Sequence, residues 1–416
     1  MERTILHVDA NCFYASVECL YNSHIQNKPV AVVGDVEKRH GIVLTANYIA
    51  KRKFGVKTGD VVWEAKRKCP NLVIRQSNMP LYIKVSKRMN QILLRYSDMV
   101  EAFGIDESWI DVTNSRQIFG SGMEIAQRIS EEVKKEIGIT VSIGVSFNKV
   151  FSKLGSDYKK PDAITEITRD NFKEIVWPLP ISDLLFVGRQ TTKKLILKNI
   201  RTIGDIANAN PEHLKTWLGK WGGILYDFAN GKDEDPVLKF NEANAIKSIG
   251  NSMTAYRDLE NEEDVKMLLF VLADSVARRL REQGLYAGVV SVTVKNNKLI
   301  SFSKQVKLSE PTNLSKEIAQ YALGLFAESY NWYNPVRALG IAVSDLSGKR
   351  EFSQVSIYND EEKKDALLRL EETQDELKKR FGSFCVQRGI LMKDSFLTQF
   401  DPKLTHTVYP GTSVGL

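Results

Sequence analysis

The feature that most constrains how this chain can fold is a pair of adjacent acids inside an apolar segment. In FGIDESWIDV, residues 103–112, Asp106 and Glu107 lie among large apolar side chains in a pattern typical of a strand or a tight hairpin. Two carboxylates within ~4 Å of each other repel by roughly 1 kcal/mol in water and by ~4 kcal/mol at an effective dielectric constant near 20. A fold that keeps this pair at the rim of its core must supply a cation or a proton.

Length and composition indicate several folded domains. With 416 residues the chain is too long for one ordinary core, and about two to four domains are expected. Its shares of 43% apolar and 26% charged residues are typical of a globular protein. No apolar run approaches the ~20 residues that span a bilayer, and the start MERTILHVDA does not resemble a signal peptide. We therefore expect a cytoplasmic protein without a membrane partner.

Cysteine and histidine usage argues against a structural metal site. The four cysteines (Cys12, Cys19, Cys69 and Cys385) form no CxxC pair, and the five histidines do not cluster. Neither a zinc site nor a disulfide framework is therefore expected. The net charge of +7 permits a polyanionic partner such as DNA, but many enzymes without such a partner are equally basic.

The order of patterns along the chain predicts an α+β fold with several domains. Apolar strands are expected at 4–9, 29–33, 42–45 and 140–146, with helices at about 80–97 and 121–136 and a basic stretch between 47 and 68. Residues 170–235 have the pattern of short helices broken by glycine, and a polar linker follows them. Residues 247–346 read as strand, helix, strand, strand, helix, strand, and a charged helix is expected from about 361 to 381, stopped by Gly382.

A second acid can be combined with the opening pair. Asp9, in HVDANCFYASVE, ends an apolar strand, where an isolated acid is usually a surface or capping residue. If this strand end faces Asp106 and Glu107, the three acids form an oxygen cage of the kind that Mg²⁺ prefers. Such a cage can hold two ions ~3.5–4 Å apart for an in-line phosphoryl transfer. A general acid–base dyad remains the alternative, although it lacks a companion histidine.

Basic residues supply groups that could hold a triphosphate. Lys160 lies in SDYKKP, and Thr45, Tyr48 and the run from Lys51 to Lys53 follow one strand and turn after the first motif. Each alone is more often a solvated surface group. Together they are suited to binding phosphates, whose transfer is catalysed by positioning and charge neutralisation.

Four ordered segments carry a specific resemblance. HVDANCFYASVE, TANYIAKRKFGVKTGD, GIDESWIDV and SIGVSFNKVFSKLGSDYKKP closely resemble the core of Y-family translesion DNA polymerases, the family of bacterial DNA polymerase IV and of the catalytic subunit of DNA polymerase V. The resemblance covers residues 1–240 strongly and 247–350 by pattern. It implies a right-hand architecture with palm (1–20 and 80–168), small fingers (21–79), helical thumb (169–235), linker (236–246), an α/β little finger (247–350) and a tail (351–416).

The resemblance also implies roles for the residues already singled out. Asp9, Asp106 and Glu107 would bind two Mg²⁺ ions, with the backbone carbonyl of Ala10 as a further ligand. Asp106 and Glu107 would line the place where the primer 3′-hydroxyl attacks the α-phosphate. Tyr14 matches the steric gate, an aromatic ring placed where a ribose 2′-hydroxyl would clash, so it would exclude ribonucleotides. Without the resemblance, Tyr14 reads as a core aromatic residue.

The matched triphosphate contacts are Thr45, Tyr48 and Lys160, together with a basic residue after Tyr48. The usual pattern ANYxARKFGV is one residue shorter than ANYIAKRKFGV here, so either Lys51 or Arg52 could fill that role. The family more often reads SIDE where this chain has GIDE, and no loss of activity is expected from that change.

Two segments further along the chain resemble sites for DNA and for a partner protein. FVGR, with Gly188 and Arg189, matches a helix-hairpin-helix turn that presents backbone N–H groups to DNA phosphates, although the family often has glycine in place of Phe186. The second such turn, LGKWGG (218–223), is a weaker match. Both could also be ordinary helical turns.

The tail carries a clamp-like peptide and an apolar helix face. QVSIY resembles the peptide that inserts into the sliding clamp, with Gln354, Ile357 and Tyr358 as contacts, or it could be a last edge strand. In the helix after it, four apolar side chains at helical spacing are expected to pack onto the body: Leu367, Leu370, Leu377 and Phe381.

The leading hypothesis is therefore a template-directed, low-fidelity translesion DNA polymerase that needs Mg²⁺, dNTPs and primer–template DNA and acts at the nucleoid. It would engage the sliding clamp and possible further partners, namely an accessory polymerase subunit or a recombinase. One alternative is a non-catalytic protein that binds DNA and clamp at stalled forks. Another is a different palm-based two-metal enzyme such as a nucleotide cyclase, which primer dependence would distinguish.

Overall fold

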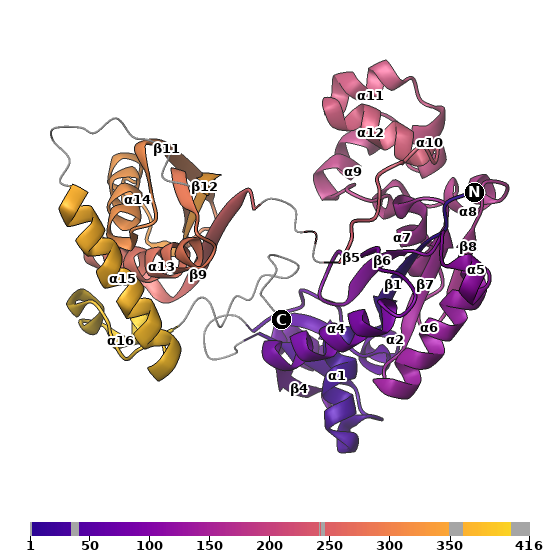
Figure 1. Cartoon of the computed structure of the whole chain (residues 1–416), viewed down its shortest axis with the longest axis horizontal. Helices are drawn as coiled ribbons and strands as arrows, with labels where there is room; N and C mark the ends of the chain where they lie inside the picture. The colour runs from indigo at the N-terminus through magenta and orange to yellow at the C-terminus, as the bar shows by residue number, and fades with distance from the viewer. Residues whose placement is uncertain (1, 35–40, 241, 243–245, 349–360, 401–416) are drawn as a thin grey trace. The chain divides into compact units, whose positions relative to one another are not determined.

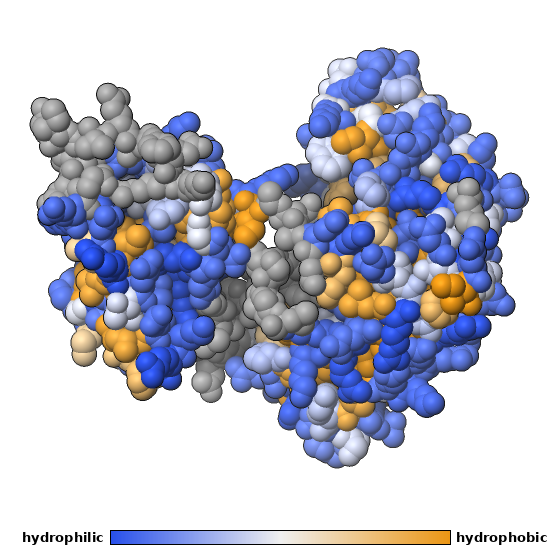
Figure 2. All heavy atoms as spheres, viewed as in Figure 1, coloured by the Kyte–Doolittle hydropathy of each residue, from blue (hydrophilic) through white to orange (hydrophobic). Residues whose placement is uncertain are grey.

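The computed structural model describes the chain except for residues 1, 35–40, 241, 243–245, 349–360 and 401–416 (Figure 1). The described residues form two compact units, one within residues 2–242 and one within 246–400. Both combine helices with sheets, as the sequence predicts. The visible face of the molecule is mainly hydrophilic, with separate hydrophobic patches (Figure 2). Among the described helices, none is long and apolar enough to cross a membrane.

A five-stranded sheet forms the centre of the first unit. Its order is β5-β6-β1-β7-β8. The bounds are Val100–Ala102 (β5), Glu107–Asp111 (β6), Ile5–Ala10 (β1), Val141–Ser146 (β7) and Ile164–Ile167 (β8). Strand β1 is buried along its whole length because it pairs with β6 on one side and β7 on the other. The central strand therefore places the end of the TILHVD segment deep inside the unit.

Helices cover both faces of this sheet. One face packs on α1 (Phe13–Tyr21), α4 (Met79–Leu93) and α6 (Gly122–Glu136), with Leu6 and Val8 of β1 in the shared core. Helix α6 starts at a capping box formed by Ser121 and Glu124. The opposite face carries α7 (Lys149–Tyr158). Because side chains alternate along a strand, the odd-numbered residues of β1 point to the α7 face.

The same unit holds a smaller sheet and a group of helices. The sheet has the order β3-β2-β4, and its bounds are Val43–Ala46 (β3), Val30–Val33 (β2) and Val73–Gln76 (β4). It packs with α2 (Tyr48–Phe54) and α3 (Val62–Lys68). Shorter helices elsewhere in the first unit are α5 (Arg116–Phe119), η1 (Ser23–Ile25) and η2 (Ile181–Asp183). The group of helices comprises α8 (Phe172–Val176), α9 (Arg189–Ile196), α10 (Ile203–Asn208), α11 (Pro211–Leu218) and α12 (Lys220–Ala229).

The second unit follows the predicted order of strand, helix, strand, strand, helix, strand. Its elements are β9 (Ser248–Leu259), α13 (Glu262–Glu282), β10 (Tyr286–Asn296), β11 (Ser301–Thr312), α14 (Ser315–Ser329) and β12 (Val336–Ser347). The antiparallel sheet has the order β11-β10-β12-β9, and α13 and α14 supply the other side of its core.

The charged tail helix packs on this unit, but only part of the apolar face that its sequence suggested is covered. Helix α15 (Glu361–Phe381) is followed by Gly382, whose φ of 95° lies in the left-handed region. Leu367 and Leu377 are half-buried, whereas Leu370 and Phe381 are exposed, so the expected packing of the last two is wrong. Instead, the buried carboxylate of Glu371 accepts hydrogen bonds from Arg281, Arg388 and Ser315. Two short helices follow, the 3₁₀ helix η3 (Gly389–Met392) and α16 (Ser395–Thr398).

Candidate active site

Strand register brings together the three acids that the sequence singles out. Asp9 of β1 lies directly opposite Glu107 of β6, although they are far apart along the chain. The backbone N–H of Ala10 donates to the carbonyl of Asp106 at 2.9 Å, which fixes Asp106 beside the end of β1. A Cβ atom added at Gly104 would lie 3.2 Å from Asp106 Oδ1 and 3.3 Å from Glu107 Oε1. Both carboxylates of the opening pair therefore lie at the tip of the same hairpin.

Close packing of α7 on the sheet completes this site. His7 and Asp9 point to the face that α7 covers, since they lie two residues apart on β1. A Cβ at Gly144 of β7 would lie 1.9 Å from the Ser152 carbonyl oxygen, inside the helix backbone. Glycine at this position thus lets α7 approach β7 more closely than any other residue would allow. That approach carries the side chain of Lys153 into the acid cluster.

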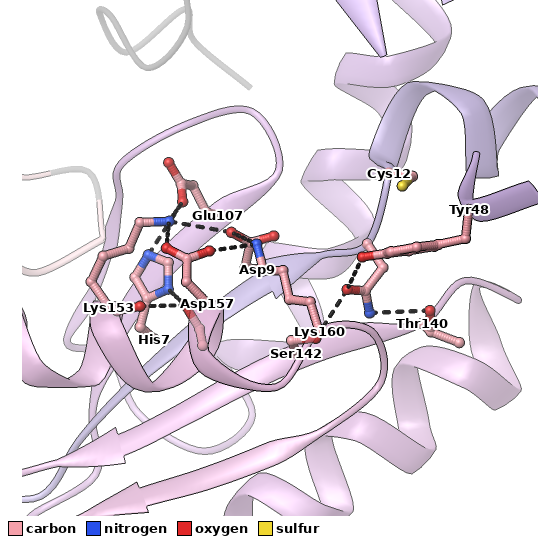
Figure 3. A network of polar contacts seen from close by, with 12 residues as sticks. His7, Asp9, Cys12, Tyr48, Glu107, Thr140, Ser142, Lys153, Asp157 and Lys160 are labelled. Atoms are coloured by element: carbon pink, nitrogen blue, oxygen red, sulfur yellow. Dashed lines mark hydrogen bonds and ion pairs between the residues drawn. The ribbon is translucent and has the colours of Figure 1, made fainter. Parts of the chain in front are cut away.

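Two lysines form ion pairs within the acid cluster (Figure 3). The Lys153 ammonium pairs with Glu107 and lies 3.3 Å from Asp9 Oδ2 and 3.4 Å from Asp157. The Lys160 ammonium lies 2.7 Å from both Asp9 and Asp157. Asp157 is exposed, whereas the other acids are mostly buried. The positive charge that the sequence led us to expect beside Glu107 and Asp9 is therefore supplied by Lys153 and Lys160.

Burial perturbs the titration of these groups. Burial raises the pKa of Asp106, and the nearby carboxylate of Asp9 raises it further. Burial also raises the pKa of Glu107, against the opposing effect of Lys153. For Lys153, burial works against the charged form, but Asp9, Asp157 and Glu107 together raise its pKa above the ordinary value. The carboxylates are thus costly to keep charged without a cation, and the lysine stays protonated.

His7 lies behind the acids as a neutral ring. Its Nδ1 is 2.8 Å from the Ser156 hydroxyl, and its Nε2 is 3.5 Å from Glu107. Within the described chain, Nε2 has no hydrogen-bond partner. Complete burial, followed by the charges of Lys153 and Lys160, holds the pKa of His7 well below its usual value. One nitrogen and two carboxylate oxygens, from His7, Asp9 and Glu107, lie within 4.8 Å of one another, which is a ligand set that could hold a metal ion.

Tyr14 stands on α1 close to the acids. Its ring stacks on the buried ring of Tyr82, with centroids 4.5 Å apart and planes 15° apart. Burial raises the pKa of Tyr14, and the charge of Asp106 adds to the effect. The stack holds the ring in one orientation.

Three of the expected triphosphate residues, Tyr48, Lys51 and Arg52, lie on α2. The Tyr48 hydroxyl lies 3.5 Å from Asn11, and the Arg52 guanidinium lies over the Tyr48 ring and 3.3 Å from the carbonyl oxygen of Lys160. The Lys51 ammonium also lies over the Tyr48 ring, 5.6 Å from its centroid, and is directed at the Cys12 sulfur, 3.3 Å away. Burial, together with Cys12 and Asp9, raises the pKa of Tyr48, so its phenol stays protonated and can donate.

The remaining sequence-derived sites lie on other elements of the first unit or outside the described chain. Thr45 pairs with Val32 inside the smaller sheet. Gly188 is the N-cap of α9, and Arg189 is its first residue. The clamp-like residues Gln354, Ile357 and Tyr358 lie outside the described residues.

Sequence reasoning missed Lys153, His7 and Asn11. His7 could have been found from the period of two along β1, which puts it on the same face as Asp9. Lys153 carried a weaker signal, because its position depends on how closely α7 approaches the sheet. Asn11 is buried and accepts from the Ser142 hydroxyl at 2.9 Å, so it links β7 to the Tyr48 side of the site.

Known proteins match this chain along nearly its whole length. Residues 8–157 and 246–357 match the impB/mucB/samB family and its C-terminal domain, and 182–233 match a thumb domain described for DNA polymerase-iota. DNA polymerase IV of Acetivibrio thermocellus is 51% identical over 399 residues, covering 96% of this chain and 100% of that protein. DNA polymerase IV 2 of Bacillus subtilis is 37% identical, covering 93% and 94%. A solved Y-family DNA polymerase chimera superposes with a TM-score of 0.73 at 26% identity, covering 82% of this chain and 98% of that one.

Proposed function

Because the chain belongs to the impB/mucB/samB family of Y-family DNA polymerases, we propose that its acid cluster is the centre at which primer DNA is extended. The chain is a DNA-directed DNA polymerase of the translesion type, acting on DNA and dNTPs and dependent on divalent metal. The observation that supports the site is the register of Asp9 opposite Glu107, with Asp106 beside them.

The acid cluster fits divalent metal. Asp9, Asp106 and Glu107 would hold two Mg²⁺ ions, with the Ala10 carbonyl as a further ligand. Hard carboxylate and carbonyl oxygens are the donors that Mg²⁺ prefers, and the raised pKa values of Asp106 and Glu107 mark a place that favours added positive charge. When bound, such ions would polarise the α-phosphate and stabilise the attacking and leaving oxygens.

The chain's own lysines hold the cluster before metal and nucleotide bind. In our proposal Lys153 keeps Glu107 and Asp9 paired and turns toward Asp157, which it already approaches at 3.4 Å, once the acids have another cation. Lys160 moves from Asp9 to the triphosphate. This exchange keeps Asp9 and Glu107 paired with a cation throughout.

The nucleotide would be oriented by side chains from α1, β3, α2 and the segment after α7. Tyr14, held by its stack on Tyr82, would exclude a 2′-hydroxyl. Tyr48 and Lys160, with Thr45, would bind the triphosphate, and we assign Arg52 rather than Lys51 as the basic partner. Arg52 lies beside Lys160, whereas Lys51 is directed at Cys12. Arginine also suits phosphate through its forked donors.

The remaining parts extend this proposal to DNA and partners. We assign palm, fingers, thumb and little finger to the residue ranges that the resemblance implies, with Gly188 and Arg189 of the thumb contacting DNA phosphates. Gln354, Ile357 and Tyr358 would bind the sliding clamp. An accessory polymerase subunit or a recombinase would be a further partner.

Primer extension tests the function. Purified protein with Mg²⁺, dNTPs and primer–template DNA should lengthen the primer only when both primer and template are present. DNA retention in a gel without extension would favour the non-catalytic alternative. Nucleotide conversion without a primer would favour a cyclase-type enzyme.

A further inference from the structure

The group of helices α8–α12 carries an exposed aromatic pair. Phe186, in the turn before α9, is 54% exposed, and Trp221, in the first turn of α12, is 49% exposed. Their ring centroids are 5.4 Å apart and their planes are tilted by 58°. Phe228 lies behind them, 6.4 Å from Phe186, and is mostly buried. The two exposed rings therefore form one apolar projection on a supporting core.

This projection is kept although the local backbone disfavours it. Phe186 has a φ of 66°, in the left-handed region where glycine is free of strain and a bulky residue is not. Exposing an aromatic ring to water is unfavourable as well. A glycine here would remove both costs, so folding alone does not explain the phenylalanine. A ligand that covers the ring would.

The surroundings of the pair are suited to a polyanion. Phe186 precedes Gly188, the N-cap of α9, and Trp221 follows Gly219, the N-cap of α12, so the ring contact brings two helix starts side by side. Among the described residues, no side chain caps either start, and a Cβ at either glycine would meet nothing within 4 Å. Helix starts with free N–H groups attract phosphates. Arg189 and Lys220 are exposed at these starts.

We propose that Phe186 and Trp221 form an apolar wedge that packs against the deoxyribose surface of duplex DNA, between phosphates bound at the two helix starts. A nucleic-acid backbone alternates anionic phosphates with apolar sugar faces, as this surface alternates N–H groups with rings. The tilt of the rings leaves no parallel face on which a base of single-stranded DNA could stack between them. The inference rests on the proposed function and adds an apolar contact to the phosphate contacts proposed there.

The test uses Phe186→Gly in the full chain, because this change removes the ring and relieves the backbone. Binding of a labelled primer–template hairpin duplex, and of a labelled single strand, is measured by fluorescence anisotropy without dNTPs, over a series of salt concentrations. Losing burial of about half a phenylalanine ring should weaken binding by about three- to tenfold. The slope of log K against log salt should stay as in the wild type, because the phosphate contacts remain. The melting temperature should be equal or higher.

Matched variants separate the wedge from its surroundings. Leu197→Ala removes an 84% exposed apolar residue at the far end of α9 and should not alter duplex binding. Arg189→Ala should weaken binding and lower the salt slope by about one. Trp221→Ala should reproduce the effect of Phe186→Gly, and the double variant should lose less than the product of the single losses, because the rings form one contact.

Three results would overturn the wedge. These are Phe186→Gly binding duplex as tightly as wild type, a flatter salt slope in that variant, or a loss confined to single-stranded DNA. A flatter slope would mean that the ring only shapes the turn that binds phosphate. None of these results would affect primer extension by the wild-type protein, so failure of the wedge is distinct from failure of the proposed function.

Discussion

Lys153 allows the electrostatics of the acid cluster to be tested without measuring catalysis. Its side chain is 16% exposed, and its ammonium compensates both Glu107 and Asp9. Replacing it by methionine keeps most of the side-chain volume and removes the charge. We expect Lys153→Met to destabilise the metal-free protein and to make its stability strongly dependent on divalent metal.

The magnitude follows from the geometry. At the 3.3 Å separation of Lys153 and Asp9, the attraction is ~5 kcal/mol for an effective dielectric constant near 20, before the desolvation of the lysine is subtracted. Breaking a buried ion pair costs about 3–5 kcal/mol, and Lys160, 2.7 Å from Asp9, offsets part of this loss. A net loss of about 2–3 kcal/mol corresponds to a fall in melting temperature of roughly 5–10 °C.

The assay is thermal unfolding with chelator and with Mg²⁺, and Lys149→Met is the matched control. Lys149 lies on the same helix and pairs with Glu101 at 2.7 Å, outside the acid cluster. Both variants should be destabilised in chelator, but Mg²⁺ should restore stability only to Lys153→Met. The reasoning is refuted if Mg²⁺ raises the melting temperature of Lys153→Met no more than that of the wild type, or raises that of Lys149→Met equally.

Three further predictions concern the same site. The pKa values of Asp106 and Glu107 are raised above 3.8 and 4.5, so the folded protein binds more protons than the unfolded chain just above these values. As pH falls from neutral into this window, these two groups should add to the stability of the metal-free protein, and the extra stability conferred by Mg²⁺ should shrink. Melting temperatures measured with and without Mg²⁺ over this pH range give both quantities. A difference between them that does not change with pH would contradict the assignment. Tyr14→Ala should raise the ratio of ribonucleotide to deoxynucleotide incorporation by at least about tenfold, or ~1.4 kcal/mol, whereas Tyr14→Phe should leave this ratio unchanged. Single-nucleotide extension measures the ratio, and an unchanged ratio in Tyr14→Ala would show that Tyr14 is not the gate. Arg52→Ala should raise the KM for dNTP about tenfold or more, because loss of a charged hydrogen bond costs about 1.5–3 kcal/mol, and Lys51→Ala should raise it less. A larger increase in KM for Lys51→Ala than for Arg52→Ala in steady-state extension would assign the triphosphate contact to Lys51.

The sequence predicted most of the architecture because its patterns are local. The strand at 4–9, the acidic hairpin, the order of elements in the second unit and the limits of α15 all follow from periodicity and turn residues. The proximity of Asp9 to the opening pair required the resemblance, since no local pattern sets the register between strands far apart in sequence.

What could not be predicted depends on packing between elements. Lys153 reaches the acids because Gly144 admits α7 so closely, and that approach is not visible in the helix itself. The apolar spacing on α15 gave no indication that Arg281 would donate a hydrogen bond to Glu371 of this helix. The unusual residue Phe186 was visible in the sequence, but its contact with Trp221 appears only in the folded chain.

The most direct test of the central claim is single-turnover primer extension by Asp106→Ala, with DNA affinity measured on the same preparation. If Asp106 holds the metal at the reacting phosphate, extension should fall by about 10³-fold or more while the Kd for primer–template DNA stays within about twofold. Extension close to the wild-type rate would contradict the assignment of the acid cluster as the catalytic centre, as would a loss of extension fully accounted for by weaker DNA binding.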